Sequence, residues 1–356
     1  MRRRLAWAGL ALAVVAALPG VTFAGDPPAE AQALFARGKE KQTAGDLDGA
    51  LADYTRALEL DGTYTGALNN RGNVRQAKGD LTGAVADFTR ALELDPGYQT
   101  AWFNRGNAKS DQGDLEGAIA DYSRAIELDA KDAQAFNNRG GVKDRNGDTQ
   151  GALADYGTAI DLDPKYVRAL DNRGALRADL GDTDGAIADF TRAIELDPRW
   201  ANAWSGRGMT KFRLRDFAGC IRDLSKALEI APSRAYSRFF LFLAQSIDGS
   251  KDAARAALVA GLAAAPAIPE GSYTGLVADF LQGKLPAEAL IQAAADVPVE
   301  KGRLGRECEA CFYAGMVAWI GGDKAAAVKL LERCVATKRE TYVEHITARA
   351  VLGWPR

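Results

Sequence analysis

The sequence predicts an all-α protein, an α-solenoid built from helix-turn-helix repeats. Three observations favour this fold. A Gly-Asp pair recurs every 34 residues, an alanine follows each pair at a constant distance, and an aromatic residue stands four positions after most of these alanines. Because one helical hairpin cannot bury its apolar face alone, repeats at a fixed period are expected to stack around a continuous core.

Residues 1–24 are expected to be an export signal. Three arginines at 2–4 precede an apolar run over 5–18, which is short for a membrane span, and small residues permit cleavage after Ala24. An uncleaved N-terminal anchor is the alternative. The chain is therefore expected to be exported, to the periplasm if the cell is Gram-negative, with no membrane span after cleavage. Residues 25–30 form a short lead into the repeats.

Six repeats of 34 residues are expected to fill residues 31–234. Their turns are Gly45-Asp46, Gly79-Asp80, Gly113-Asp114, Gly147-Asp148, Gly181-Asp182 and, in the sixth repeat, Arg215-Asp216. The turn glycine is expected to end the first helix of each repeat in the left-handed conformation. A second glycine, such as Gly38, is expected to face Ala50 or its equivalent, so that the two helices approach closely.

An Asp-Pro step closes several repeats. Asp95, Asp163 and Asp197 each precede a proline, and this pair predicts the N-cap and first residue of the following helix.

The pattern weakens after Arg234. Residues 235–307 are expected to hold degenerate repeats and a linker, the linker running from Asp296 to Glu307. Residues 308–356 are expected to form a terminal repeat and a capping helix, which is placed at Thr341 to Leu352.

Composition excludes several classes of function. The 356 residues carry a formal net charge of -2, which is not the basic footprint of a nucleic-acid-binding protein. The single histidine, His345, excludes a multi-histidine metal site. No nucleophile with supporting context stands near it in the sequence, so His345 is expected to be structural. The sequence therefore predicts a protein without catalysis, metal or cofactor.

Four cysteines are present, three of them in the last repeat. Cys308 and Cys311 form a Cys-x-x-Cys pair, but a zinc site needs two more ligands and a haem attachment site needs a histidine where Phe312 stands. An exported setting favours a disulfide. From their positions on two antiparallel helices, Cys308 and Cys334 are the expected pair. Cys311 with Cys334, and four reduced thiols, are the alternatives.

The recurring glycine, alanine and aromatic positions over residues 31–234 resemble tetratricopeptide (TPR) repeats. This resemblance implies a right-handed superhelix whose first helices line a concave groove, and a scaffold that binds proteins or peptides. Asparagines at the sixth position are implied to hold an extended peptide backbone, because each amide both donates and accepts hydrogen bonds. The alternative is that these asparagines belong to the general repeat consensus and only cap or solvate the groove. The candidate groove residues are Asn70, Asn73, Asn104, Asn107, Asn138, Asn172, Phe103, Met209 and Phe212.

Tyr236 to Leu352 resembles the TPR lipoproteins of the NlpI type from bacterial cell envelopes. The matching stretches include Phe239–Ala244, Phe280–Leu285 and Tyr342–His345. The resemblance implies an adaptor, often dimeric, that joins envelope hydrolases and proteases, although the lipid-bearing cysteine is missing. The alternative function is a structural subunit of an envelope or secretion assembly. Three residues of the terminal repeat are expected either to form a partner or dimer surface or to seal the solenoid: Phe312, Met316 and Trp319.

Two charged series share the 34-residue period. Arginines at the seventh position, such as Arg105, accompany aspartates of the second helix, such as Asp121. These series are expected to form structural ion pairs, each contributing about 0–1 kcal/mol if exposed.

Overall fold

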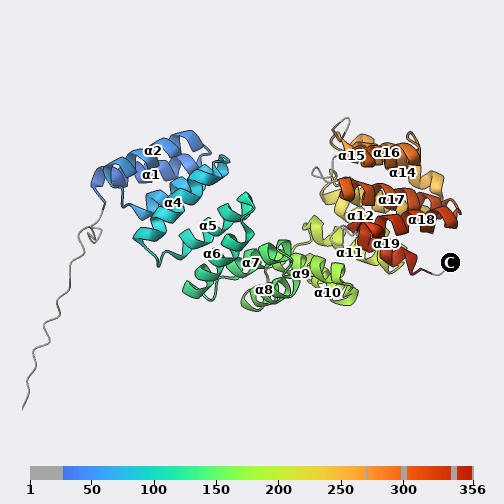
Figure 1. Ribbon diagram of the computed structural model, residues 1–356, viewed down its shortest axis with the longest axis horizontal. Helices are drawn as coiled ribbons and strands as arrows, with labels where there is room; N and C mark the ends of the chain where they lie inside the picture. The colour runs from blue at the N-terminus through green and yellow to red at the C-terminus, as the bar shows by residue number, and fades with distance from the viewer. Residues whose placement is uncertain (1–26, 270–271, 298–302, 338–342, 355–356) are drawn as a thin grey trace, which may run out of the picture. The chain divides into compact units, whose positions relative to one another are not determined.

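The computed structural model describes residues 27–269, 272–297, 303–337 and 343–354, and its secondary structure there is helical without strands (Figure 1). The expected signal sequence and cleavage site lie outside these residues. The helices are α1 (Ala29–Thr43), α2 (Leu47–Leu60), α3 (Thr65–Ala77), α4 (Leu81–Leu94), α5 (Gln99–Gln112), α6 (Leu115–Leu128), α7 (Ala133–Arg145), α8 (Thr149–Leu162), α9 (Val167–Leu180), α10 (Thr183–Leu196), α11 (Ala201–Arg213), α12 (Phe217–Ile230), α13 (Ala235–Asp248), α14 (Lys251–Ala264), α15 (Tyr273–Gln282), α16 (Ala287–Ala295), α17 (Arg303–Ile320), α18 (Lys324–Ala336) and α19 (Val343–Leu352).

The chain divides into two compact units. Unit 1 spans Met1–Leu128 and contains the hairpins α1–α2, α3–α4 and α5–α6, whereas unit 2 spans Asp129–Arg356 and contains α7 to α19. In each unit, consecutive helices pack as antiparallel pairs, and each pair packs against the next (Figure 1). None of the described helices is both long and apolar enough to cross a membrane. The expected all-α repeat architecture is confirmed.

The turn residues form the hairpins as expected. Gly113 has φ = 85° and ends α5 in the left-handed conformation, which a residue without a Cβ adopts without strain. Asp114 then caps α6, because its Oδ1 accepts a hydrogen bond from the N–H of Gly117 at 3.0 Å. In the sixth repeat, Arg215 takes the left-handed place with φ = 65°, and its guanidinium lies 5.7 Å from the ring centre of Trp354.

The expected role of the Asp-Pro steps is wrong. Asp95 stands at the C-terminal end of α4, and α5 begins only at Gln99. The Asp95 carboxylate accepts a hydrogen bond from the N–H of Gly97 at 2.9 Å, and Asp163 and Asp197 accept equivalent bonds from the residues two positions on. These aspartates therefore stabilise a turn between repeats, and helix capping belongs to the Gly-Asp turns within them.

The glycine at the eighth position brings the two helices of a repeat together. At Gly106, a Cβ atom would lie 2.9 Å from Cε1 of Tyr122, and at Gly72 it would lie 2.6 Å from Cε1 of Phe88. The partner of the glycine is thus chiefly the ring of the second helix, four positions beyond the alanine expected from the sequence. Tyr122 is 2% exposed and Phe88 is fully buried, so this contact forms the centre of each hairpin.

Each of the six hairpins also contains an ion triad around a nearly buried aspartate. In the third repeat, Arg105 donates two hydrogen bonds of 2.8 Å to the Asp121 carboxylate, and Lys109 approaches the same group at 2.9 Å. The Asp121 side chain is only 3% exposed. In the first repeat, hydrogen bonds from Arg37 and Lys41 lower the pKa of Asp53 to about 2. The expected ion pairs are therefore present, but their carboxylates are buried, which those of a surface ion pair are not.

Unit 2 departs from the repeat pattern after α12. Aromatic side chains of α11, α13 and α17 form its largest core cluster, in which Phe240 lies 5.4 Å from Phe212 and 5.6 Å from Phe312 between ring centres. Helix α17 begins at Arg303, so the linker expected to extend to Glu307 ends earlier. Helix α19 closes the core, since Trp354 just after it donates a hydrogen bond to the carbonyl oxygen of Arg213 at 3.2 Å.

Replacing Asp121 tests the energetic weight of a triad. Asp121→Asn leaves two cations close together without their carboxylate, and we expect a loss of about 3 kcal/mol in the free energy of unfolding. The control is Glu127→Gln, which breaks an exposed pair with Arg124 at 2.6 Å and is expected to cost less than about 0.5 kcal/mol. Urea unfolding followed by circular dichroism measures both. Equal losses in the two variants would contradict a special role of the triad.

Candidate functional site

The first helices of the repeats form the inner layer of each unit. In unit 1, α3 contacts both α1 and α5, and in unit 2, α11 contacts both α9 and α13. No pair of second helices from neighbouring repeats has comparable contact among the residues that the structure describes. Since the layer with the closer spacing lies on the inside of a curve, the first helices of each unit line its concave side.

In unit 1, asparagine side chains connect neighbouring first helices. Asn104 on α5 donates a hydrogen bond of 2.9 Å to Oδ1 of Asn69 on α3, and Asn69 donates one of 3.3 Å to Asn70. Asn70 in turn donates to the hydroxyl of Tyr54 at 3.5 Å. Asn69 is 4% exposed, whereas Asn70 and Asn104 are half-buried. The buried amide therefore orients the two amides that remain accessible.

Three further candidates in unit 1 differ in their surroundings. Asn107 accepts a hydrogen bond of 2.6 Å from the hydroxyl of Tyr122, so its oxygen is engaged within the hairpin. Phe103 packs at 5.7 Å from the Tyr122 ring and keeps part of its surface accessible. Asn73 is half-buried and makes no side-chain hydrogen bond to the described residues. Of the three, Asn73 has the most hydrogen-bonding capacity left for a ligand.

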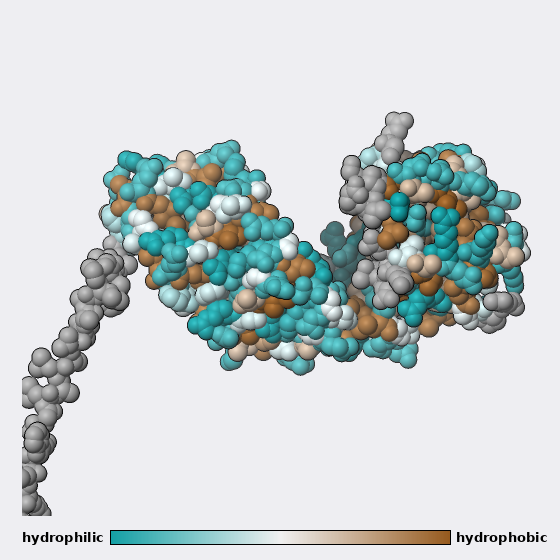
Figure 2. Space-filling model, in the orientation of Figure 1, coloured by the Kyte–Doolittle hydropathy of each residue, from teal (hydrophilic) through white to brown (hydrophobic). Residues whose placement is uncertain are grey.

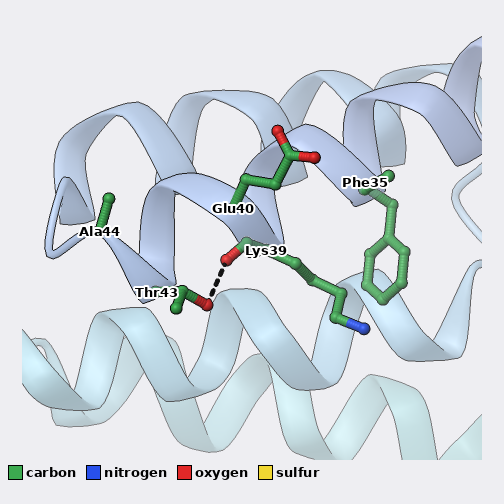
Figure 3. A pocket seen from close by; sticks show the side chains of 6 residues that line it. Phe35, Lys39, Glu40, Thr43 and Ala44 are labelled. Atoms are coloured by element: carbon green, nitrogen blue, oxygen red, sulfur yellow. Dashed lines mark hydrogen bonds between the residues drawn. The ribbon is translucent and has the colours of Figure 1, made fainter.

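A pocket of about 670 Å³ lies against α1 in the same unit (Figure 3). It is lined by Phe35 and Lys39 among others, which hold the fifth and ninth repeat positions and so match Asn69 and Asn73 of the next repeat. Figure 3 shows both side chains extending to the same side of α1, and the Lys39 ammonium lies 5.8 Å from the Phe35 ring centre. The inner face of unit 1 thus begins with an aromatic and cationic site.

In unit 2 the same amide contact recurs. Asn172 on α9 donates a hydrogen bond of 3.0 Å to Oδ1 of Asn137 on α7, and Asn137 donates one of 3.2 Å to Asn138. Asn137 is 3% exposed. The Asn-Asn pairs at 69–70 and 137–138 therefore make the same hydrogen bonds, each in its own unit.

The inner face of unit 2 ends near α11. Met209 lines a pocket of about 580 Å³ together with Tyr236 and Ile268, so it remains a candidate ligand contact. Phe212 is no longer a candidate ligand contact, because it is fully buried and its ring centre lies 5.7 Å from that of Trp354. The expected role of Phe212 in the groove is wrong, since the C-terminal end of the chain covers that position.

The terminal repeat offers less surface than expected. Phe312 and Met316 are fully buried in the core of unit 2. Of the two roles expected for them, they therefore seal the solenoid and do not form a partner or dimer surface. Trp319 is partly buried, against Trp354 at 6.2 Å. His345 is 3% exposed with Nε2 at 3.1 Å from the carbonyl oxygen of Val335, which is a structural contact. Among the described residues, no cluster of potential metal ligands is present.

An acidic side chain bonds to Tyr236, one of the residues that line the Met209 pocket. The hydroxyl of Tyr236 donates a hydrogen bond to Glu309 at 3.2 Å. Burial, reinforced by the nearby Glu344 carboxyl, raises the pKa of Glu309 to about 8. Burial also raises the pKa of Glu344, which accepts a hydrogen bond from Tyr313 at 3.2 Å. The Glu309 carboxyl beside Tyr236 is therefore largely protonated at neutral pH.

Sequence reasoning missed Asn69 and Asn137. Both stand at the fifth repeat position, where other repeats have Phe103, Asp171 and Ser205. Their role follows from burial and from a hydrogen bond to the next repeat, neither of which the period reveals. The repeated Asn-Asn pair was the signal in the sequence.

These features define a helical-repeat scaffold with a ligand-accessible inner face. TPR family models match residues 31–64, 72–113, 107–147, 138–199 and 172–235, together more than half of the chain. The chain therefore belongs to the tetratricopeptide repeat proteins, a class that typically acts as a non-catalytic scaffold for protein interactions.

Two solved structures with TM-scores above 0.5 agree with this fold. A tetratricopeptide repeat protein from Parabacteroides merdae is 20% identical, with 72% of this chain and 98% of that chain covered and a TM-score of 0.55. PilF of Pseudomonas aeruginosa is 16% identical, with 62% and 97% covered and a TM-score of 0.52. MamA is 28% identical, with 45% and 94% covered and a TM-score of 0.43. A comparison with curated proteins found no match. The NlpI-type resemblance stays a prediction.

Glu309 gives unit 2 a defined pH dependence. An unfolded Glu has a pKa near 4.3, whereas burial raises the pKa of Glu309 in the folded chain to about 8. The folded state thus binds more protons in this window, and its stability falls as pH rises through it, by up to about 1.4 kcal/mol per pH unit. Glu309→Gln is expected to flatten this part of the curve, measured by urea unfolding between pH 5 and 8. The exposed Glu332→Gln is the control, and identical slopes for both variants would contradict the assignment.

Proposed function

We propose that the chain is a non-catalytic adaptor of the cell envelope that binds extended segments of other proteins along its first helices. The observation that carries this proposal is the oriented amide pair in each unit. Asn104 uses one N–H to reach Asn69, and within the described residues its other N–H and its carbonyl oxygen have no partner. Such an amide pairs with both the N–H and the C=O of a peptide backbone.

The character of the surface supports recognition by hydrogen bonds. On the face shown in Figure 2, apolar residues are scattered among polar ones in each unit. Apolar contacts are available locally, from Phe35 and Phe103 in unit 1 and from Met209 in unit 2. A ligand is thus held mainly through its backbone, and these side chains select which residues it carries.

The envelope assignment rests on the sequence. The expected export signal at 1–24 and the NlpI-type likeness of the C-terminal third support it. Envelope hydrolases and proteases are the partner classes which that likeness implies.

Crosslinking in intact cells tests where partners bind. A photoreactive amino acid placed at Asn73 on α3 is expected to capture discrete proteins. The control places the same group at Glu93 on α4, whose side chain is 58% exposed on a second helix. Identical patterns of captured proteins from both positions would contradict binding along the first helices.

Paired substitutions then test the amides with a captured partner. Asn70→Ala with Asn104→Ala, or Asn138→Ala with Asn172→Ala, removes two hydrogen-bonding groups from one unit. At about 1 kcal/mol each, we expect the Kd to rise tenfold or more in the unit that binds. The matched control is Glu59→Ala with Glu93→Ala, and thermal unfolding identifies variants whose fold has changed. An unchanged Kd for both amide pairs would remove the proposal.

A further inference from the structure

The last hairpin brings two buried cysteines into direct contact. Cys308 on α17 and Cys334 on α18 are both fully buried, and their Sγ atoms lie 2.6 Å apart. Non-bonded carbon atoms pack at about 3.5–4.0 Å, and sulfur is larger than carbon, so two independent thiols do not fit at this separation. We propose that Cys308 and Cys334 form a disulfide bond that fastens α17 to α18.

The backbone of the hairpin presents the two residues to each other. Gly322, with φ = 88°, turns the chain between α17 and α18, and the two helices pack along their length. At Gly315, a Cβ atom would lie 3.0 Å from Cγ of Leu331, so the helices approach as closely as in the regular repeats. Cys308 and Cys334 lie beyond this contact, toward the open end of the hairpin.

The other two cysteines are less suited to the bond. Cys311 is one turn along α17 from Cys308 and is also fully buried, but its sulfur has no comparable contact with another cysteine. Cys220 lies on α12, in another repeat. Among the four cysteine side chains, all of them described, the Cys308–Cys334 contact alone places two sulfurs within bonding reach.

The reaction needs a disulfide oxidant, which is either a small molecule such as oxidised glutathione or an oxidoreductase. One cysteine thiolate attacks a sulfur of the oxidant, which forms a mixed disulfide and releases the first oxidant thiol. The second cysteine thiolate attacks the mixed disulfide, forms the Cys308–Cys334 bond and releases the second oxidant thiol. Both cysteines lose their protons and two electrons pass to the oxidant, which ends as two thiols.

Burial sets the time at which the bond forms. Burial raises the pKa of the Cys311 thiol to about 11, and the contact with Cys308 together with burial raises the pKa of the Cys334 thiol, so these two thiols are poorly nucleophilic at neutral pH. The bond therefore forms while the hairpin folds, in an oxidising compartment such as the one to which the expected signal sequence directs the chain.

The position of the bond gives it a structural role. Helix α18 packs against α17 and α19, and the carbonyl oxygen of Val335, next to Cys334, lies 3.1 Å from Nε2 of His345. A bond at Cys334 keeps this segment of α18 in register and thereby holds α19 against the core.

Thiol counting on the full chain tests the proposal. The protein is refolded from the reduced, denatured state in a mixture of reduced and oxidised glutathione, then unfolded without reductant and alkylated. Of its four cysteines, two are expected to react, Cys220 and Cys311, and peptide mapping is expected to join Cys308 to Cys334. Four reactive thiols, or a peptide joining Cys311 to Cys334, would overturn the proposal.

Matched variants separate the bond from general effects of losing a cysteine. Cys220→Ala is expected to keep the linked peptide, and Cys308→Ala is expected to lose it. Reductant is expected to lower the Tm of the wild type and of Cys220→Ala by about 2–8 °C, while that of Cys308→Ala stays unchanged. The same response to reductant in all three proteins would show that no structural bond exists.

Discussion

The close approach of two helices within each hairpin is the constraint on which the structure depends. It requires a glycine at the eighth position, because the ring of the second helix occupies the space of a side chain there, as Tyr122 does at Gly106. The ring also reaches the inner face. The hydroxyl of Tyr122 donates to Asn107, and that of Tyr54 accepts from Asn70. The contact that holds a hairpin together thus also positions amides of the candidate binding face.

The ion triads complement this contact. A glycine and a ring fix the distance between two helices, but they leave the helices free to slide along each other. A carboxylate that accepts from two cations one turn apart, as Asp121 does from Arg105 and Lys109, fixes their relative position. Because the carboxylate is nearly buried, a shifted register leaves a charge without its partners, which costs far more than an exposed pair contributes. The triads therefore fix the register of the two helices in addition to stabilising the hairpin.

The sequence predicts the repeats well because the information is local. The glycine turns and the period follow from a few residues within each hairpin, and the structure confirms them. The failures concern contacts between distant segments. Phe212 occupies a groove position by its period, but Trp354 covers it, and Phe312 and Met316 are buried by helices far away in the sequence. The error over the Asp-Pro steps has a local cause, since this dipeptide is compatible with both a helix start and a turn. In the structure, Tyr98 rather than Asp95 occupies the N-cap position of α5.

The loss of periodicity after α12 has a physical cause that also limits the binding face. In a regular array, each repeat buries its apolar surface against a similar neighbour, and the inner positions of the first helix stay accessible. In unit 2, the inner positions of α11 are used by the chain itself. Phe212 packs against Trp354 at 5.7 Å between ring centres, and Arg213 donates to Thr347 at 3.2 Å. A residue with such a unique partner no longer makes the contacts of its repeat position, so the 34-residue pattern weakens there. Accessible surface on α11 is thereby reduced to the region of Met209, and a count of repeats alone overestimates the length of the site.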